Sequence, residues 1–465
     1  MSTKTANGAY DIVVIGGGLV GTSLALALHP LGLRVALLEA ATGDNTPAPA
    51  TDQRTLALNW GSRQILEGIG AWCQVEPLAS PIHRLHVSDA GHSGITRLDR
   101  TLIGQSALGY VVPAHSLRAV LAAQLKTCGT IDHYTPAICD QVSVMDTQAV
   151  VRCSATDLSL TARLVVLADG GRSTLRQQFG LDACEKAYDQ AVLVTTVLTS
   201  KVHGQLAFER FTLGGPLALL PLAGPRFALA WTLPADQAPV LASLPESIFL
   251  AKLQHCFGDR AGTFLSATAR HVFPLHLTDV PNAATERAVA IGNAAHIMHP
   301  VAGQGLNLGL RDVAELAERL QAAHHEEHDI GSTAFLTAYV AARRGQTRRV
   351  LSFTDGLVRL FSNNVPGVGL VRNIGLNLLD IAPPIKRTLL RRTTGLAGRL
   401  PRLARGLPLQ THAKTPAMPH GCPHRYSRRW RRHGRERFCR RPRRQSIADP
   451  CDQRALTLSL ARTPL

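Results

Sequence analysis

The stretch DIVVIGGGLVGTSLALALHPLGLRVALLE, residues 11–39, determines how this 465-residue chain begins to fold. An apolar run leads into three consecutive glycines, an apolar helical stretch that ends at Gly32 follows, and a second apolar run comes next. This order is typical of a strand, a glycine turn, a helix and a second strand. We therefore expect the first βαβ unit of a Rossmann-like α/β domain.

Each glycine of the turn has a physical reason. Gly16 allows the tight turn, Gly18 lets the backbone approach a pyrophosphate, and Gly21 lets the helix pack closely on the strand. Glu39 closes the second strand and is expected to accept hydrogen bonds from ribose hydroxyls, while its charge disfavours a 2′-phosphate. The unit predicts a site for FAD or NAD and does not by itself distinguish them.

A second strand end carries an acidic residue. The run ARLVVLADGG, residues 162–171, is typical of a buried parallel strand and brings Asp169 and Gly170 to its carboxyl end. Ser173 follows as a suitable N-cap for a short helix. On its own, the segment is equally compatible with a surface turn before a capped helix.

A third segment, AVAIGNAAHIMHPVAGQGLNLGLRD, covers residues 288–312. Its strand ends at Gly292 and Asn293, and a loop with Gly303 and Gly305 feeds an amphipathic helix over residues 306–320. A glycine loop at a helix N-terminus can stabilise a developing negative charge, such as that of a reduced flavin. His299 lies in this loop and could approach a flavin or simply support the loop.

The remaining sequence organises around these strand ends. A helical pattern covers residues 56–66, and β-branched runs at 81–102 and 188–234 predict a second, mostly antiparallel sheet inserted into the nucleotide fold. Residues 337–400 are predicted to be helical and become increasingly basic. The expected division is FAD-binding parts at 1–80, 111–180 and 286–325, substrate-domain parts at 81–110 and 181–285, C-terminal helices at 326–408, and a basic tail at 409–465.

Composition narrows the function classes. The formal net charge is +17, but residues 410–465 hold 14 Lys/Arg and three Asp/Glu, so most of the basicity lies in this tail. Its core, residues 421–444, is predicted to be either a disordered extension or a non-native reading frame rather than a nucleic-acid site. Nine scattered cysteines without paired spacing favour reduced thiols and no metal site. We find no apolar run long enough for a membrane span and no room for a secretory signal, which predicts a cytoplasmic protein.

Taken together, the three strand-end segments resemble the FAD-dependent aromatic hydroxylases typified by para-hydroxybenzoate hydroxylase. The resemblance covers about residues 11–406. It implies FAD as cofactor, NAD(P)H or a reduced partner as electron donor, and O2 as co-substrate. The cofactor-binding residues that the resemblance and the glycine turns imply are Gly16, Gly18, Gly21, Glu39, Arg54, Asp169, Gly170, Gly292, Asn293, Gly303, Gly305 and Asn307.

One position departs from the family pattern. The family has Asp where this chain has Asn293, and an amide can still hydrogen-bond to a ribityl chain but carries no charge. Asn293 and the runs RLHVSDAGHSG (84–94) and AFERFTLGGPLALLPL (207–222) are similar to the ubiquinone-biosynthesis branch, whose members hydroxylate phenols such as 2-octaprenyl-6-methoxyphenol. The sequence identifies no catalytic base.

The resemblance implies a polyprenylated phenol as substrate. Residues 355–400 alternate apolar and basic runs. This composition suits peripheral contact with the inner face of an anionic membrane or with subunits of a ubiquinone-synthesis complex. It suits equally well an ordinary pair of helices with a solvated basic face. Two alternatives stay open. One is a flavin hydroxylase or other oxidoreductase of a soluble aromatic, and the other is a non-catalytic subunit of such a complex.

Overall fold

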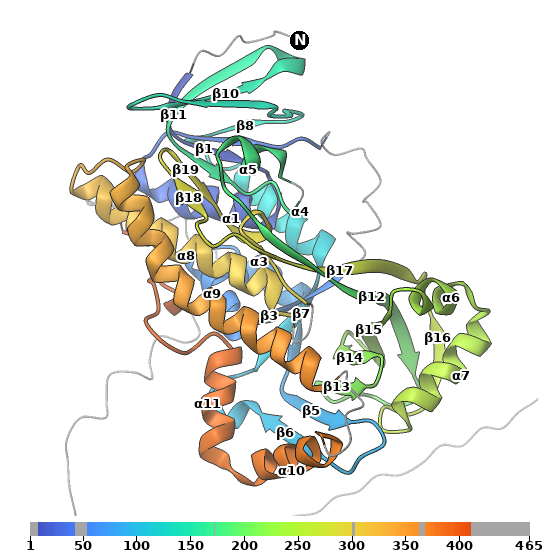
Figure 1. The fold of residues 1–465 in the computed structure, drawn as a ribbon. Coiled ribbons are helices and arrows are strands. Elements are labelled where there is room, and N and C mark those ends of the chain that lie inside the picture. The colour runs from blue at the N-terminus through green and yellow to red at the C-terminus, as the bar shows by residue number, and fades with distance from the viewer. Residues whose placement is uncertain (1–7, 42–53, 172, 300–302, 362–367, 411–465) are drawn as a thin grey trace, which may run out of the picture. The chain divides into compact units, whose positions relative to one another are not determined.

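The computed structural model describes residues 8–41, 54–171, 173–299, 303–361 and 368–410 (Figure 1). These residues belong to one compact unit, Met1–Lys414. The sequence predicts a basic tail at 409–465, and all of that segment after Gln410 lies outside the described residues.

The first sheet has eight strands and is built around the segment that opens the chain. Its parallel core has the order β19, β11, β1, β2 and β8, and β1 pairs in parallel with both β11 and β2. The strands are β1 (Gly8–Ile15), β2 (Val35–Leu38), β8 (Ile131–Tyr134), β9 (Gln141–Val144), β10 (Ala149–Cys153), β11 (Leu158–Leu167), β18 (Ala284–Thr285) and β19 (Ala288–Ala290). The predicted Rossmann-like α/β class is confirmed.

Helices cover one face of this sheet because its strands are apolar on both sides. Helix α1 (Leu19–Leu28) packs against α4 (Ala114–Leu125) and α8 (Gln304–His325), and their buried aliphatic side chains form one core with β1 and β2. The opposite face packs against the β9–β10 hairpin and the short helix α5 (Thr174–Gln178). Three strands separated in sequence, β1, β11 and β19, thereby end at one edge of the sheet.

The second sheet has nine strands, and eight of them follow the order β20, β17, β12, β15, β14, β13, β5 and β6. All pairs are antiparallel except β13 with β5, as predicted for an inserted, mostly antiparallel sheet. The strands are β5 (Arg84–Asp89), β6 (Ile95–Asp99), β12 (Cys184–Thr199), β13 (Leu206–Thr212), β14 (Gly215–Pro221), β15 (Arg226–Pro234), β16 (Phe264–Ala267), β17 (His271–Asp279) and β20 (His296–Ile297).

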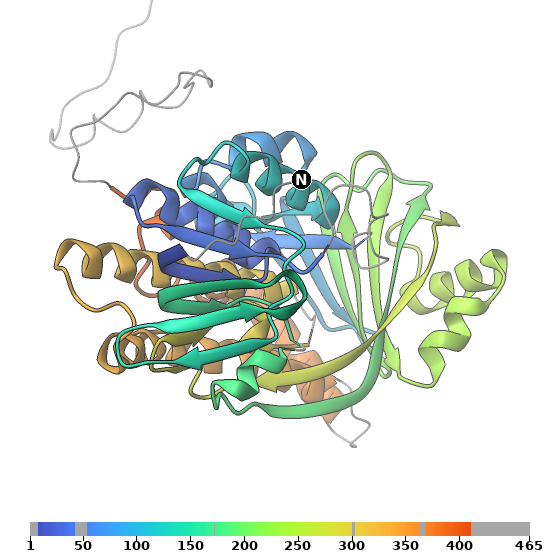
Figure 2. The same cartoon turned by 90° about the horizontal axis from the view of Figure 1, so that it is seen from above.

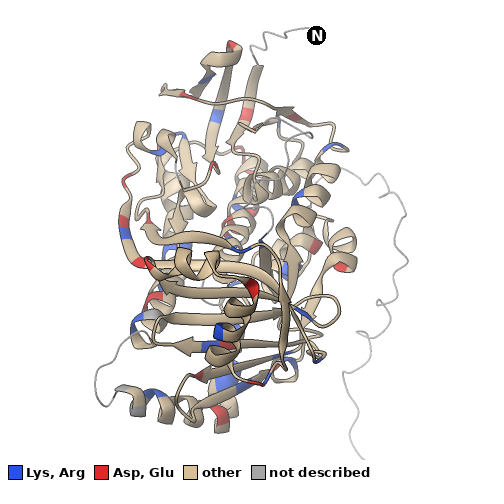
Figure 3. Cartoon of the chain, turned by 90° about the vertical axis from the view of Figure 1, so that its right-hand side faces the viewer, with Lys and Arg blue, Asp and Glu red and all other residues tan. Residues whose placement is uncertain are grey.

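The large sheet has one face on helices and the other toward the first sheet. Figure 2 shows α6 (Gln237–Ser243) and α7 (Glu246–Phe257) on the outer side, where Phe249 and Trp231 belong to a separate core. Its strand ribbons are mostly tan in Figure 3, because few of their residues are charged.

A small three-stranded sheet corrects one expectation. Strand β3 (Thr55–Asn59) pairs with β7 (Gly109–Pro113), which also pairs with β4 (Ser80–Ile82). The helix predicted over residues 56–66 is wrong for its first part, since α2 spans Trp60–Gly68. Five paired residues in β3 outweigh the helical periodicity, and the Asn59 side chain caps α2 by accepting from the Ser62 amide at 2.9 Å.

The C-terminal helical region is as predicted. Helices α9 (Thr333–Phe361), α10 (Val368–Ile381) and α11 (Pro383–Thr393) follow α8. The short helix α3 (Trp72–Val75) comes earlier in the chain and packs into the core that α1 and α8 form with the first sheet. Within the described ranges, no helix is both long and apolar enough to cross a bilayer.

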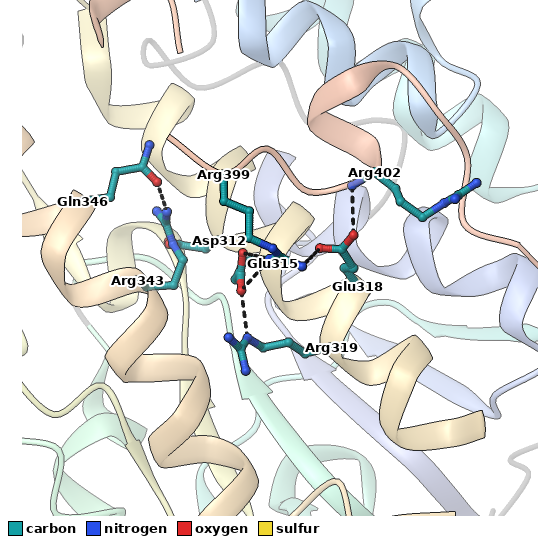
Figure 4. A network of polar contacts seen from close by, with 8 residues as sticks. All are labelled: Asp312, Glu315, Glu318, Arg319, Arg343, Gln346, Arg399 and Arg402. Carbon is teal, nitrogen blue, oxygen red and sulfur yellow. Dashed lines mark hydrogen bonds and ion pairs between the residues drawn. The ribbon is translucent and has the colours of Figure 1, made fainter. Parts of the chain in front are cut away.

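A polar network fixes α8 against α9 and the segment after α11 (Figure 4). Asp312 on α8 accepts from Arg343 at 2.7 Å, and Arg399 reaches both Glu315 and Glu318 of α8. The middle of α8 is thus held against α9 and against the segment after α11.

Candidate functional site

One large cavity of about 1390 Å³ runs along the carboxyl ends of β1, β2 and β11 and continues over the inner face of the large sheet. Ligands of open α/β sheets bind at the carboxyl ends of the strands, so this edge is where a dinucleotide is expected. The volume exceeds the roughly 300–1,000 Å³ of an ordinary small-molecule pocket. The cavity has room for a cofactor and a second ligand.

The glycine turn after β1 forms one end of the cavity. Gly16 has a φ of +106°, and a Cβ there would collide with the backbone of Ala168 on the neighbouring strand end. A Cβ at Gly21 would collide with the Gly16 carbonyl, so this glycine allows α1 to sit close to β1. Around Gly18, in contrast, no atom outside the turn itself lies within 4 Å of where a Cβ would stand, and the residue lines the cavity. That open space beside the α1 N-terminus fits a pyrophosphate.

Two side chains from neighbouring segments reach the same end. Glu39, directly after β2, is held by backbone hydrogen bonds to Tyr134 and Ala137, and its carboxylate accepts from the Ala41 amide at 2.9 Å. Arg54, just before β3, lies over the Phe273 ring at 5.4 Å. Both line the cavity, so an acceptor and a cation face the space where an adenosine diphosphate would lie.

The Asp169–Gly170 turn after β11 forms the adjoining wall. Burial raises the pKa of the Asp169 carboxyl, although the Ser173 hydroxyl partly offsets this by hydrogen bonding. Ser173 also caps α5, as expected, by accepting from the Arg176 amide at 3.1 Å. The buried Arg176 guanidinium donates to the Ala294 carbonyl at 3.2 Å, and this bond ties the second strand-end segment to the third.

The third segment presents Asn293 to the cavity. Its neighbour Gly292 has a φ of +58° and donates its amide to the Asp312 carboxylate at 3.0 Å. Asp312 also accepts from His296 at 2.7 Å. Burial opposes the charge of this carboxyl, but Arg343 and His296 outweigh it and hold the pKa of Asp312 at about 2. The Asn293 side chain is exposed while Gly292 and Ala294 on either side are buried, so the turn directs an amide into the cavity.

The N-terminus of α8 closes this part of the site. Gly303 has a φ of +61° and is the N-cap, and a Cβ there would lie 2.8 Å from Ala57. Gly305 has open space around it and lines the cavity. Asn307 is buried and uses both amide atoms within the protein: its oxygen accepts from Ser62 at 2.6 Å and its nitrogen donates to the Ala57 carbonyl at 2.8 Å. Asn307 thus also positions α8 against β3.

Ten of the twelve residues predicted to bind the cofactor line this one cavity, and Gly21 and Gly292 lie behind it as packing residues. The two helix N-termini, of α1 and α8, both open onto the same space. His299, in contrast, does not line the cavity. It is fully buried against the Tyr188 ring at 5.3 Å, and burial lowers its pKa to about 4.

The sequence did not point to two polar cavity residues, Arg118 on α4 and Glu209 on β13. Glu209 lies in the strand LAFERFT, where Phe208 and Arg210 face the opposite side, since Phe208 belongs to the core with α7 and Arg210 donates to the Cys256 carbonyl. An acid at an inward position of an apolar, alternating strand was the available signal. Within the described residues, no hydrogen bond or ion pair joins its carboxyl group, and burial alone raises its pKa to about 7.

Comparison with known proteins identifies the family. Residues 9–354 match a family model described as "FAD binding domain". The ubiquinone hydroxylase UbiL of Rhodospirillum rubrum is 36% identical over 410 residues, which cover 88% of this chain and 95% of that protein. The human mitochondrial ubiquinone biosynthesis monooxygenase COQ6 is 28% identical, with 84% and 93% of the two chains covered.

Among solved structures, p-nitrophenol 4-monooxygenase PnpA from Pseudomonas putida DLL-E4 has the same fold, with a TM-score of 0.68, 20% identity, and coverage of 84% of this chain and 99% of that one. The chain belongs to the FAD binding domain family, and it is an FAD-dependent monooxygenase.

Proposed function

We propose that this member of the FAD binding domain family hydroxylates a polyprenylated phenol in ubiquinone biosynthesis, with O2 as oxidant and NAD(P)H or a reduced partner as electron donor. One observation carries the proposal: a single cavity joins the cofactor edge of the first sheet to a long apolar chamber on the second. A soluble aromatic acid would need a cationic anchor in that chamber, and the arginine of α10 that lines it, Arg372, is already paired with Asp89.

The residues at the sheet edge fit FAD. We expect the α1 N-terminus with Gly18 to receive the pyrophosphate, Glu39 the ribose hydroxyls, and Asn293 the ribityl chain. Arg54 and Arg118 supply positive charge, and the α8 N-terminus at Gly303 and Gly305 stabilises negative charge on the ring system. When bound and reduced, FAD activates O2 so that one oxygen atom reaches the ring and the other leaves as water. The partly desolvated Asp169 is proposed to assist the nicotinamide donor.

The chamber over the large sheet suits the substrate. Its wall consists largely of inward-facing aliphatic and small side chains, among them Val87 of β5, Ala218 and Leu220 of β14, Ala230 of β15 and Val194 of β12. It continues between the sheet and the C-terminal helices, where Leu376, Leu379 and Leu389 line it. The protein's own task there is to hold an apolar ring and chain and to exclude water.

The far end of the chamber supports contact with a lipid surface. Ile385 of α11 lines the cavity and is also 59% exposed, so the cavity reaches the surface there. Leu378 and Ile381 of α10 are exposed beside it, and Arg387, Arg391 and Arg392 of α11 are exposed on the same helix pair. Exposed aliphatic side chains with adjacent cations are the combination that binds anionic membranes peripherally. We propose that substrate enters from the cytoplasmic face of the membrane through this opening.

The test is a purified, full-length protein supplied with a prenylated phenol. We expect a yellow protein whose NADH or NADPH oxidation is accelerated by the phenol and yields a hydroxylated product in equal amount. A colourless protein that takes up no FAD contradicts the whole proposal. A yellow protein that hydroxylates only soluble phenols contradicts the proposed substrate, and one with no product at all favours a non-catalytic subunit.

A further inference from the structure

One row of residues crosses the inner face of the large sheet. The strand register aligns Glu209 with Val87 on one side and with Ala218 on the other, and Ala218 with Ala230. The row continues from Val87 to Thr96 on β6 and from Ala230 through Val194 to His271 on β17, and all seven side chains line the cavity. Since neighbouring strands lie about 4.8 Å apart, the two alanines leave a flat, shallow floor about 5–10 Å from the Glu209 backbone.

Glu209 is the one acid among these seven residues, and its two register neighbours, Val87 and Ala218, are apolar. The Thr96 hydroxyl donates to the Leu376 carbonyl at 2.7 Å and so is already engaged. The charged and titratable groups on the neighbouring walls are Asp89 of β5 and Arg372 of α10, which pair with each other at 3.4 Å, and His271 at the end of the row. None of them shifts the pKa of Glu209. Burial of its carboxyl group is the single cause of the raised pKa.

A carboxyl group on a mostly apolar cavity wall, without a hydrogen bond from the protein, depends on a partner inside the cavity. Glu209 is buried, yet it borders the cavity, and the part of the chain that the structure describes provides it no partner. A ligand can provide that partner. The ligand that matches this wall has a flat apolar ring for the alanine floor and one hydroxyl group for the acid.

Resting on the proposed function, we propose that Glu209 binds the phenolic hydroxyl of the substrate and accepts its proton during hydroxylation. The O–H bond of the phenol breaks, and a new O–H bond forms on the carboxylate. The electron pair stays on the phenolate oxygen and enriches the ortho and para ring carbons, one of which forms the new C–O bond. That carbon then loses its hydrogen as a proton. O2 is the oxidant, and its second atom leaves as water with two electrons from the donor of the proposed function.

The raised pKa suits this role. An ordinary glutamate, with a pKa of about 4.3, is a weak base toward a phenol, whose pKa is near 10. With a pKa of about 7, Glu209 is a stronger base that is still substantially ionised at neutral pH. The hydroxylation rate should therefore rise with pH up to about 7 and then level off as the carboxylate becomes fully populated.

The experiment compares full-length, FAD-loaded wild type with Glu209→Gln and Glu209→Leu, using a farnesylated methoxyphenol and its methyl ether as probes. Binding to the oxidised protein is followed by the change in flavin absorbance. Wild type should bind the phenol about tenfold more tightly than the ether. Glu209→Gln, which keeps a hydrogen-bonding amide, should retain phenol affinity within about threefold but hydroxylate at least about 100-fold more slowly. Glu209→Leu should lose the preference for the phenol.

Glu286→Gln, an exposed acid outside the cavity, is the matched control and should behave as wild type. FAD content and the unfolding temperature of each variant report whether it is folded. Equal rates, equal pH profiles and equal phenol preference in wild type and both Glu209 variants overturn the proposal. If wild type retains FAD but hydroxylates no phenol, the proposed function fails instead, and the two failures are distinguishable. A phenol preference that disappears in Glu209→Leu supports the binding role independently of turnover.

Discussion

Gly18 is a residue at which a substitution should block the cofactor site. It is the N-cap of α1, it lines the cavity, and no atom outside the turn lies within 4 Å of where a Cβ would stand. Gly18→Val should leave the fold intact and fill the space for the pyrophosphate. We expect FAD to bind at least about 100-fold more weakly, which corresponds to roughly 2.7 kcal/mol, measured by equilibrium dialysis of the apoprotein.

Gly129→Val is the control for this change, because Gly129 also has open space within 4 Å of a Cβ position and does not line the cavity. It should bind FAD as wild type does. Normal flavin content in Gly18→Val would mean that the turn has been assigned the wrong ligand.

Single residues differ in how far the sequence reveals them. Gly16, Gly18 and Glu39 stand in a local pattern whose spacing carries its meaning, so their places at the strand ends could be predicted. Asn307 could be placed on α8, but its bonds to Ser62 and Ala57 join positions 245 and 250 residues apart and have no local signal. Glu209 has a local signal, as an acid in an alternating apolar strand, but its alignment with Ala218 and, through it, with Ala230 has none.

At the scale of elements, α8 depends on one buried carboxylate. Asp312 joins the Gly292 turn, His296 and Arg343 of α9. Asp312→Asn keeps the shape of the side chain but leaves the buried Arg343 without its counter-charge. Breaking a buried ion pair in this way lowers the free energy of unfolding by about 3–5 kcal/mol. The urea midpoint should fall accordingly, whereas Asp236→Asn, at an exposed position, should leave it unchanged. Equal midpoints for both variants would contradict the assigned role of the network.

The same carboxylate predicts a pH dependence of stability. The folded-state pKa of Asp312 is about 2, below the roughly 3.9 of an unfolded aspartate. The stabilisation is therefore present above about pH 4 and is lost as the pH falls from about 4 towards 2. Denaturation curves at several pH values should show this loss in wild type and a smaller one in Asp312→Asn.

The pair α10–α11 tests the proposed membrane contact. Leu378 and Ile381 are 56% and 75% exposed, so replacing both by Glu should not disturb the core. We expect binding to vesicles of anionic phospholipid to weaken at least about tenfold, because apolar burial is lost and negative charge is added. The control is Val240→Glu with Leu265→Glu, two exposed aliphatic positions on α6 and β16. Equal vesicle binding by both double variants would locate the contact elsewhere.

Elements with strong local patterns were predictable, and those defined by partners were not. The strand-turn-helix segment at residues 11–39 has the predicted order, since every part of it is set by neighbours in sequence. The apolar spacing of β3 suits either a helix or a strand, and only its pairing with β7, about 50 residues later, decides for the strand. The inserted sheet was expected from its β-branched runs, but the parallel pairing of β13 with β5 was not.

At the scale of the whole molecule, the described fold ends close to Gln410. Leu409 is buried, and the Gln321 side chain donates to the Gln410 carbonyl at 2.6 Å. A chain that stops after Lys414, the end of the compact unit, should keep the FAD content and unfolding temperature of the full chain. A chain that stops after Gly406 should unfold at a lower temperature, because it loses Leu409. Loss of FAD from the chain that stops after Lys414 would show that the residues after Lys414 contribute to cofactor binding, a role that we do not assign to them.

This cavity is proposed to join FAD, O2 and a prenylated phenol in one oxygen transfer. The most direct measurement is the mass of the product formed under isotopically heavy O2 by the full-length, FAD-loaded protein with NADH or NADPH and a farnesylated methoxyphenol. We predict one heavy oxygen atom on the ring of each product molecule. A product whose new oxygen comes from water, or NAD(P)H consumption that yields only hydrogen peroxide, would contradict the proposed oxygen transfer.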